Sequence, residues 1–328
     1  MTGVQTCALP ICELASQYSE KLPGLVAEAV AEAAVRLQPV ALGAGLGRED
    51  RLAFNRRFYM RDGTVGWNPG KLNPDIVMPA GVTDPEVGVL LAETIPTNRQ
   101  PKEAIATFVN FAMHPDTTGG SRFSADYPGA LSRVLAGYKG PRMVTLFANG
   151  TCGNINHIDV QWGGRQGGLE EAWRIGVLLG GTVLQTYKSM TPVRPGPLRI
   201  ASELVKLPLA PVSPEEIAQA RIDVRTAKDN TRDGFMKLVK GHQVLDVAAR
   251  EGRPLVVEVQ VITLGSDLAW VSLPGEVFVE IGMAIKKRSP FRFTFLAELA
   301  NGSIGYIPDR RSYPEGNYEP VSEIGRAH

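Results

Sequence analysis

The chain has 328 residues, of which 44% are hydrophobic, and a formal net charge of +1 at pH 7. This length suffices for one large domain or two small ones with a buried core. The near-zero charge gives no reason to expect a nucleic-acid partner, and no apolar run of about 18 residues indicates a membrane-spanning helix.

The two ends of the sequence resemble translated sequencing-adapter read-through. We therefore treat residues 1–12 and 322–328 as non-native and expect a single domain over 13–321, cut short at both ends. Cys152 is the one cysteine inside this range, so the range cannot form an internal disulfide. Its histidines are His114, His157 and His242.

Apolar periodicity predicts the first elements. A helix is expected over 22–37, with Pro23 in its first turn, and a strand over 39–46. The Gly-, Pro- and Arg-rich stretch 48–85 shows little periodicity and is predicted to be a long functional or disordered loop. Further predictions are strands over 86–92, 103–113 and 143–148, and a helix over 126–136 with Asp126 as its N-cap.

The second half of the chain alternates in the same way. Helices are expected over 169–190, over 213–247 with a break near Asn230, and over 276–287 beginning at Glu276. Strands are expected over 198–209 and 291–299, and a hairpin over 255–264 and 268–273. This alternation predicts an α/β fold, with a mixed β-sheet core flanked by helices.

Three positions for chemistry follow from this arrangement, because α/β enzymes place their chemistry where strands end. His114 follows an apolar strand, and histidine is a common metal ligand and proton carrier. Segment 149–157 is turn-rich, and its N–H groups could bind an anion. Glu276 opens a predicted helix, where the helix dipole favours a carboxylate whatever its function. The residues alone leave an ordinary structural interpretation open for all three.

Several short motifs resemble those of the neutral (alkaline, non-lysosomal) ceramidase family, and they occur in the same order over most of 13–321. These motifs are Asn55-Arg56, His114, Ser124-Ala-Asp-Tyr-Pro-Gly129, Gly153-Asn-Ile-Asn156, Leu273-Pro-Gly-Glu276, Gly305-Tyr-Ile-Pro308 and Gly316-Asn-Tyr-Glu319. The resemblance implies the family's N-terminal catalytic domain, an α/β fold of the zinc-hydrolase kind.

The resemblance also implies a site. His114, Glu276 and Tyr306 would bind one Zn²⁺, with a further histidine ligand expected upstream of this sequence. Arg56 and Tyr318 would hold the amide carbonyl and its oxyanion. Zinc with nitrogen and oxygen ligands lowers the pKa of a bound water or hydroxyl to about 7.

Asn156 departs from the family pattern, because it stands where the family has its serine nucleophile. Three interpretations are open: zinc-activated water attacks directly, Thr151 or Cys152 replaces the serine, or a weakened site is kept for binding. We favour water, because the implied zinc ligands and oxyanion groups are kept. His157 is either a proton carrier or an ordinary polar loop residue, and Asp116 is a candidate hydrogen-bond partner of His114.

The sequence therefore predicts a zinc-dependent hydrolase that cleaves the N-acyl amide bond of ceramide, or a related amide or ester. The alternative is a catalytically inactive relative that binds a lipid or a glycan. We expect a small-molecule or lipid substrate, peripheral contact with membranes to reach it, and neither a nucleic-acid nor a protein partner. Members of the resembled family are commonly exported, so the resemblance implies a secreted or periplasmic location.

Overall fold

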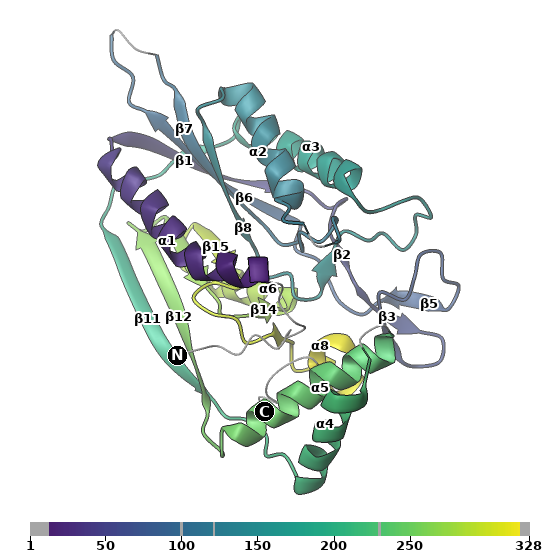
Figure 1. Ribbon diagram of the computed structural model, residues 1–328. Helices are drawn as coiled ribbons and strands as arrows, with labels where there is room; N and C mark the ends of the chain where they lie inside the picture. Colours follow the sequence, from purple (N-terminus) through teal and green to yellow (C-terminus); the bar gives the residue numbers. More distant parts are fainter. Residues whose placement is uncertain (1–12, 99–100, 121, 229–230, 322–328) are drawn as a thin grey trace.

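The computed structural model describes residues 13–98, 101–120, 122–228 and 231–321. Its larger sheet has the strand order β10-β1-β6-β7-β8 (Figure 1). Neighbouring strands pair antiparallel except for β7 and β8, which are parallel. The strands are β1 (Val40–Arg48), β6 (Glu86–Thr94), β7 (Ala104–Phe111), β8 (Val144–Asn149) and β10 (Thr191–Pro192).

A four-stranded sheet with the order β11-β12-β13-β15 lies against this first sheet. Its strands are β11 (Leu198–Leu207), β12 (Leu255–Leu264), β13 (Leu268–Ser272) and β15 (Phe293–Ala297). The buried side chain of Asn110 on β7 donates to Leu296 O (2.8 Å) and accepts from Leu296 N (3.1 Å). One amide thus ties the two sheets together.

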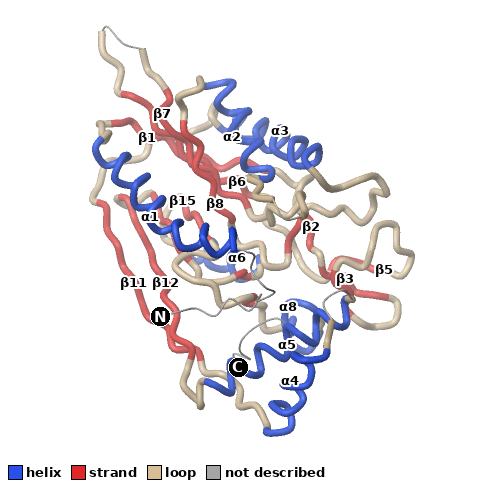
Figure 2. The backbone as a smooth tube through the Cα atoms, viewed as in Figure 1, coloured by secondary structure: helices blue, strands red, loops and turns tan. Residues whose placement is uncertain are grey.

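Two helices, α2 (Asp126–Lys139) and α3 (Leu169–Thr186), pack side by side on the outer face of the larger sheet (Figure 2). The core beneath them joins alternate residues of β6, such as Val87 and Val89, to helical positions such as Ile175 and Leu179. The two periodicities, two for a strand and about 3.6 for a helix, explain why these residues share one interior. The α/β fold class with a mixed sheet is confirmed.

The stretch 48–85 is not a long loop, and that prediction is wrong. It contains β2 (Phe54–Asn55), β3 (Arg57–Met60), β4 (Val65–Trp67) and β5 (Ile76–Pro79). β3 pairs with both β4 and β5, whereas β2 pairs with β9 (Ile155–Asn156), far away in sequence. Strands of two to four residues are too short to show a period.

The prediction that Glu276 opens a helix is also wrong. Glu276 lies in β14 (Glu276–Val277), which pairs parallel with β16 (Tyr306–Ile307), and helix α6 (Val279–Arg288) begins after Phe278. The carboxylate is therefore placed by strand pairing and not by a helix dipole.

Two helix starts also differ from expectation. Helix α1 (Glu13–Val35) has Pro23 in its interior and leaves its apolar residues in solvent, with Val30 63% exposed. At α2 the N-cap is Ala125, and the Asp126 carboxylate instead accepts from Thr117 Oγ1 and the Thr118 amide. Asp126 thereby anchors the loop that follows His114.

The remaining predicted elements are found within a few residues of their expected bounds. The charged helical pair is α4 (Pro214–Thr226) and α5 (Arg232–Ala249), and two short helices, α7 (Ser312–Glu315) and α8 (Tyr318–Val321), end the described chain. Asn230 and the segments predicted to be non-native lie outside the described residues. None of the described helices is both long and apolar enough to span a membrane.

Candidate functional site

His114 is oriented by the backbone that faces it. Its Nδ1 lies 2.8 Å from Ile155 O, and its Nε2 lies 2.8 Å from Glu276 Oε2. A carbonyl oxygen and an ionised carboxylate only accept, so both ring nitrogens donate in this arrangement, and Nε2 would have to lose its proton to bind a metal. Nε2 and a carboxylate oxygen therefore converge on one point from elements 162 residues apart.

Strand pairing brings Tyr306 beside Glu276, because the two are register partners in β14 and β16. Burial raises the pKa of the Glu276 carboxyl, but hydrogen bonds from His114 and Tyr306 outweigh it and lower the pKa below its usual value. Burial opposes protonation of His114, yet the hydrogen bond to Glu276 raises the pKa of the imidazole. Burial raises the pKa of Tyr306 strongly, against the nearby Arg56 charge, so the phenol stays neutral.

Arg56 is a buried cation held from two sides. Its Nε donates to Glu319 Oε1 (2.8 Å), and its Nη2 donates to Gly153 O (2.7 Å). The guanidinium also lies 5.3 Å from the Tyr306 ring centroid and 5.8 Å from that of Tyr318. Burial opposes its charge, but Tyr306 and Glu319 raise its pKa, so the charge is permanent.

Tyr318 closes the aromatic side of this cluster. Its ring stacks on Trp67 with centroids 4.2 Å apart and meets Tyr306 edge-on at 5.4 Å. Five residues that the sequence proposed for the site therefore gather in one place in the structure: His114, Glu276, Tyr306, Arg56 and Tyr318.

Asn156 is a near neighbour of this cluster, but its amide is used within its own surroundings. Its Nδ2 donates to Asn68 Oδ1 (3.0 Å), and its Oδ1 accepts from the Ile158 amide (3.1 Å). The second bond is an Asx turn, a local structural use of asparagine. The side chain is buried.

Both ring nitrogens of His157 face acceptors. Nδ1 lies 2.9 Å from Asp116 Oδ1, and Nε2 lies 2.9 Å from Gln166 O. Both nitrogens must then donate, which makes the ring an imidazolium. Burial opposes this charge, but Asp116 raises the pKa of His157. Asp116 therefore partners His157 and not His114, contrary to expectation.

The two suggested replacements for the serine are both buried. The Cys152 thiol donates to Glu298 Oε1 (2.8 Å), and burial together with that carboxyl raises its pKa well above the usual value. A thiol whose pKa is raised is a poor nucleophile at neutral pH. The geometry does not favour Cys152 in that role.

Sequence reasoning missed three members of this neighbourhood: Trp67, Asn68 and Glu319. A carboxylate partner such as Glu319 could have been expected from the sequence, because two consecutive arginines, Arg56 and Arg57, require a carboxylate if both are buried. Trp67 and Asn68 had none, since their partners come from distant segments.

The donor atoms at the His114 end of the cluster are of the types that bind zinc. Within the described ranges no group of three or more His, Cys, Asp or Glu side chains is placed to hold a metal ion. His114 and Glu276 supply one nitrogen and one oxygen donor that already converge, and Tyr306 adds a phenol oxygen. This donor set suits zinc, and a backbone carbonyl on the other imidazole nitrogen is the usual support for a histidine ligand.

The chain matches no known family model and no curated protein sequence. Its fold is similar to that of solved ceramidases. It superposes on neutral ceramidase from Pseudomonas aeruginosa with a TM-score of 0.60 and 17% identity, over 90% of this chain and 50% of that one. A ceramidase complexed with C2 gives a TM-score of 0.56 and 17% identity, over 88% of this chain and 51% of that one. The chain thus spans about half the length of both structures, and at this identity the likeness shows a ceramidase-like fold.

Proposed function

We propose that this chain is a zinc-dependent hydrolase that cleaves an N-acyl amide bond, in ceramide or in a related amide or ester. The observation that carries this proposal is the convergence of His114 Nε2 and Glu276 Oε2, 2.8 Å apart, beside a buried arginine and two phenols. The ceramidase-like fold supports the reaction class, and the substrate follows from that likeness by analogy alone.

His114, Glu276 and Tyr306 would hold the zinc ion. When bound, zinc acidifies water and polarises a carbonyl. The chain's own groups do the remaining work. Arg56, fixed by Glu319 and Gly153, presents a permanent positive charge, and the Tyr318 ring packs against it. A fixed charge of this kind stabilises the oxyanion of an acyl-transfer transition state by about 3 to 4 kcal/mol.

Water is the proposed nucleophile. An asparagine amide is not an acyl acceptor, and Asn156 already uses its nitrogen and oxygen in hydrogen bonds with Asn68 and the Ile158 amide. By its position beside Ile155, whose carbonyl holds His114, Asn156 supports the geometry of the site.

A catalytically inactive relative that binds a lipid or a glycan is the second candidate. The specific observation in its favour is that the side chains of Asn154 and Asn156 are both engaged in structural hydrogen bonds and not directed to a reaction. Asn154 donates to Glu280 Oε2 (2.9 Å) and accepts from the Val279 amide (2.9 Å). Contact with membranes and export from the cytoplasm are proposals that rest on the ceramidase likeness.

Zinc titration and turnover of a fluorescent N-acyl sphingosine separate the two candidates. We expect zinc binding and turnover in the wild type, and loss of both in Glu276→Ala. Glu203→Ala, on the exposed strand β11, is the matched control and should change neither. Zinc binding without turnover of amide or ester substrates would favour the inactive relative, and absence of zinc binding would overturn the metal site.

A further inference from the structure

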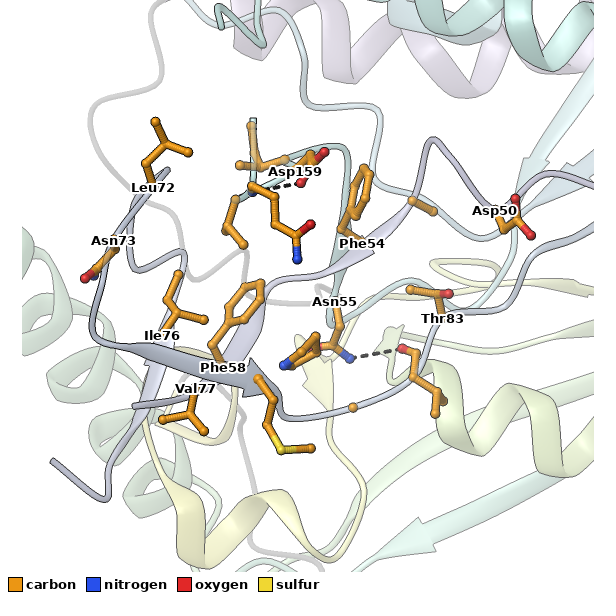
Figure 3. A pocket seen from close by; sticks show the side chains of 18 residues that line it. Asp50, Phe54, Asn55, Phe58, Leu72, Asn73, Ile76, Val77, Thr83 and Asp159 are labelled. Atoms are coloured by element: carbon orange, nitrogen blue, oxygen red, sulfur yellow. Dashed lines mark hydrogen bonds between the residues drawn. The ribbon is translucent and has the colours of Figure 1, made fainter. Parts of the chain in front are cut away.

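A hollow lies between β2, the sheet of β3 and β5, and segment 158–161 (Figure 3). Its volume is about 1030 Å³, which is the size of a pocket for a small ligand. None of the five residues gathered at the proposed hydrolase site lines it.

The lining is mostly apolar and partly open to water. Phe54 and Phe58 point into the hollow together with Ile76 (Figure 3). At the rim, Val77 is 59% exposed and Met78 is 55% exposed. Apolar surface left in water costs about 25 cal/mol for each Å², so covering this surface favours an apolar ligand.

The charge of the lining has one sign. It contains two carboxylates, Asp50 and Asp159, and no lysine, arginine or histidine. Asp50 forms an exposed ion pair with Arg48 (3.1 Å). Asp159 accepts the Gln161 amide through Oδ1 (2.8 Å), and no cationic side chain pairs with it among the ion pairs of the described residues. A carboxylate beside an apolar wall disfavours an anionic ligand and favours a cationic one.

We infer that this pocket binds an aliphatic chain that carries a primary amine. The ammonium group lies beside Asp159, and the chain covers Phe54, Phe58 and Ile76. None of the proposed zinc ligands lines this pocket, and the inference holds whether or not the protein is a hydrolase.

Isothermal titration with three eight-carbon probes below their micelle concentrations tests the inference. At pH 7 we expect octylamine to bind more tightly than octanol, and octanoate to bind most weakly. Asp159→Asn should weaken octylamine binding about 5-fold, the effect of one partly exposed charge pair, and leave octanol unchanged. Asp75→Asn, an exposed aspartate outside the lining, is the matched control.

A second variant adds a charge at the rim without touching the core. Val77→Lys should weaken octylamine and strengthen octanoate, because its ammonium group faces the same hollow. Equal affinity for octylamine and octanol in the wild type would overturn the amine assignment. Absence of binding by all three probes, or tightest binding of octanoate, would overturn the site itself.

Discussion

Asn156 and His157 are adjacent residues whose polar atoms are already engaged. Asn156 bonds Asn68 and the Ile158 amide, and His157 bonds Asp116 and Gln166. A nucleophile or a general base needs an accessible lone pair, and neither residue offers one in this arrangement. At the residue scale, chemistry is therefore expected at His114, Glu276 and Arg56.

Replacing Asn156 tests this division of roles. Asn156→Ala should reduce N-acyl amide turnover less than Glu276→Ala does, because the alanine removes a supporting residue and not a proposed zinc ligand. It should also lower the free energy of unfolding by about 1 to 3 kcal/mol, since the half-buried Asn68 Oδ1 and the Ile158 amide lose their hydrogen bonds to the buried Asn156 side chain. Steady-state kinetics and urea unfolding measure both effects. Equal loss of turnover in the two variants would assign Asn156 a direct catalytic role.

The ion pair of His157 and Asp116 predicts a pH dependence of stability. Burial opposes the His157 charge, but Asp116 raises the pKa of His157 above 6.5, so the stabilisation is complete below pH 6.5 and is lost as pH rises through the folded pKa. Against burial, His157 lowers the pKa of Asp116 below 3.8, so its contribution is complete above pH 3.8 and is lost at lower pH.

His157→Gln should therefore cost most between about pH 4 and 6.5 and less at pH 9. Urea unfolding of both proteins at pH 5.5 and pH 9 measures the difference. His242→Gln, on helix α5, is the matched control. A cost for His157→Gln that is the same at both pH values would show that the pair is not ionic.

Helix α8 is held by buried charges and not by its own length, since four residues make barely one turn. Glu319 is fully buried and accepts from Arg56 Nε (2.8 Å) and Arg57 Nη1 (2.9 Å). Glu315 on α7 adds contacts to Arg57 Nη2 (3.1 Å) and the Tyr59 hydroxyl (3.0 Å). At the element scale, the β2–β3 segment and the last two helices form one unit that carries both Arg56 and Tyr318.

Glu319→Ala should lower the free energy of unfolding by about 3 to 5 kcal/mol, because it leaves two buried arginines without a shared carboxylate. Glu319→Gln should cost less, since the amide oxygen still accepts one hydrogen bond. Guanidinium unfolding gives these values. The exposed Glu203→Ala should stay within about 0.5 kcal/mol of the wild type. A loss of unfolding free energy in Glu319→Ala as small as that of this control would show that Glu319 does not stabilise the two buried arginines.

At the scale of the whole molecule, Glu298 connects elements from both large sheets and β14. It follows β15, and its carboxyl accepts from the Cys152 amide (3.0 Å) and the Val277 amide (3.1 Å), while its own amide donates to Asn149 O on β8 (3.2 Å). Both large sheets and β14 therefore meet at one buried residue. Burial raises the pKa of Glu298 to about 7, although His114 and Cys152 act in the opposite direction.

This raised pKa predicts a loss of stability as the pH rises from mildly acid to neutral. The folded state keeps the Glu298 proton up to about pH 7, whereas the unfolded carboxyl releases it near pH 4.5. The stabilising effect is then complete below pH 4.5 and is lost as pH rises to about 7. Glu298→Gln, which has no proton to release, should gain stability relative to the wild type between pH 5 and 8. Thermal unfolding with a chelator present measures this trend, and parallel curves for the two proteins would refute it.

The limits of sequence reasoning show at particular residues. Val87, Val89 and Val109 alternate along long strands, so their burial and the α/β class were predictable. The sequence pattern predicted a helix at Glu276, because its neighbours in sequence are compatible with one. Its strand partner, Tyr306 in β16, is 30 residues away. Strands as short as β2 and β14 are stabilised by their distant partners and leave no local period.

By itself, the sequence determined the alternation of strands and helices and the order of the motifs around His114, Glu276 and Tyr306. Only the tertiary structure decided that Glu276 meets His114, that Asn68 and Asp116 engage Asn156 and His157, and that an apolar pocket opens beside Asp159. The reason is physical: periodic burial is written into neighbouring residues, whereas contacts across 100 or more residues depend on how the closed chain packs.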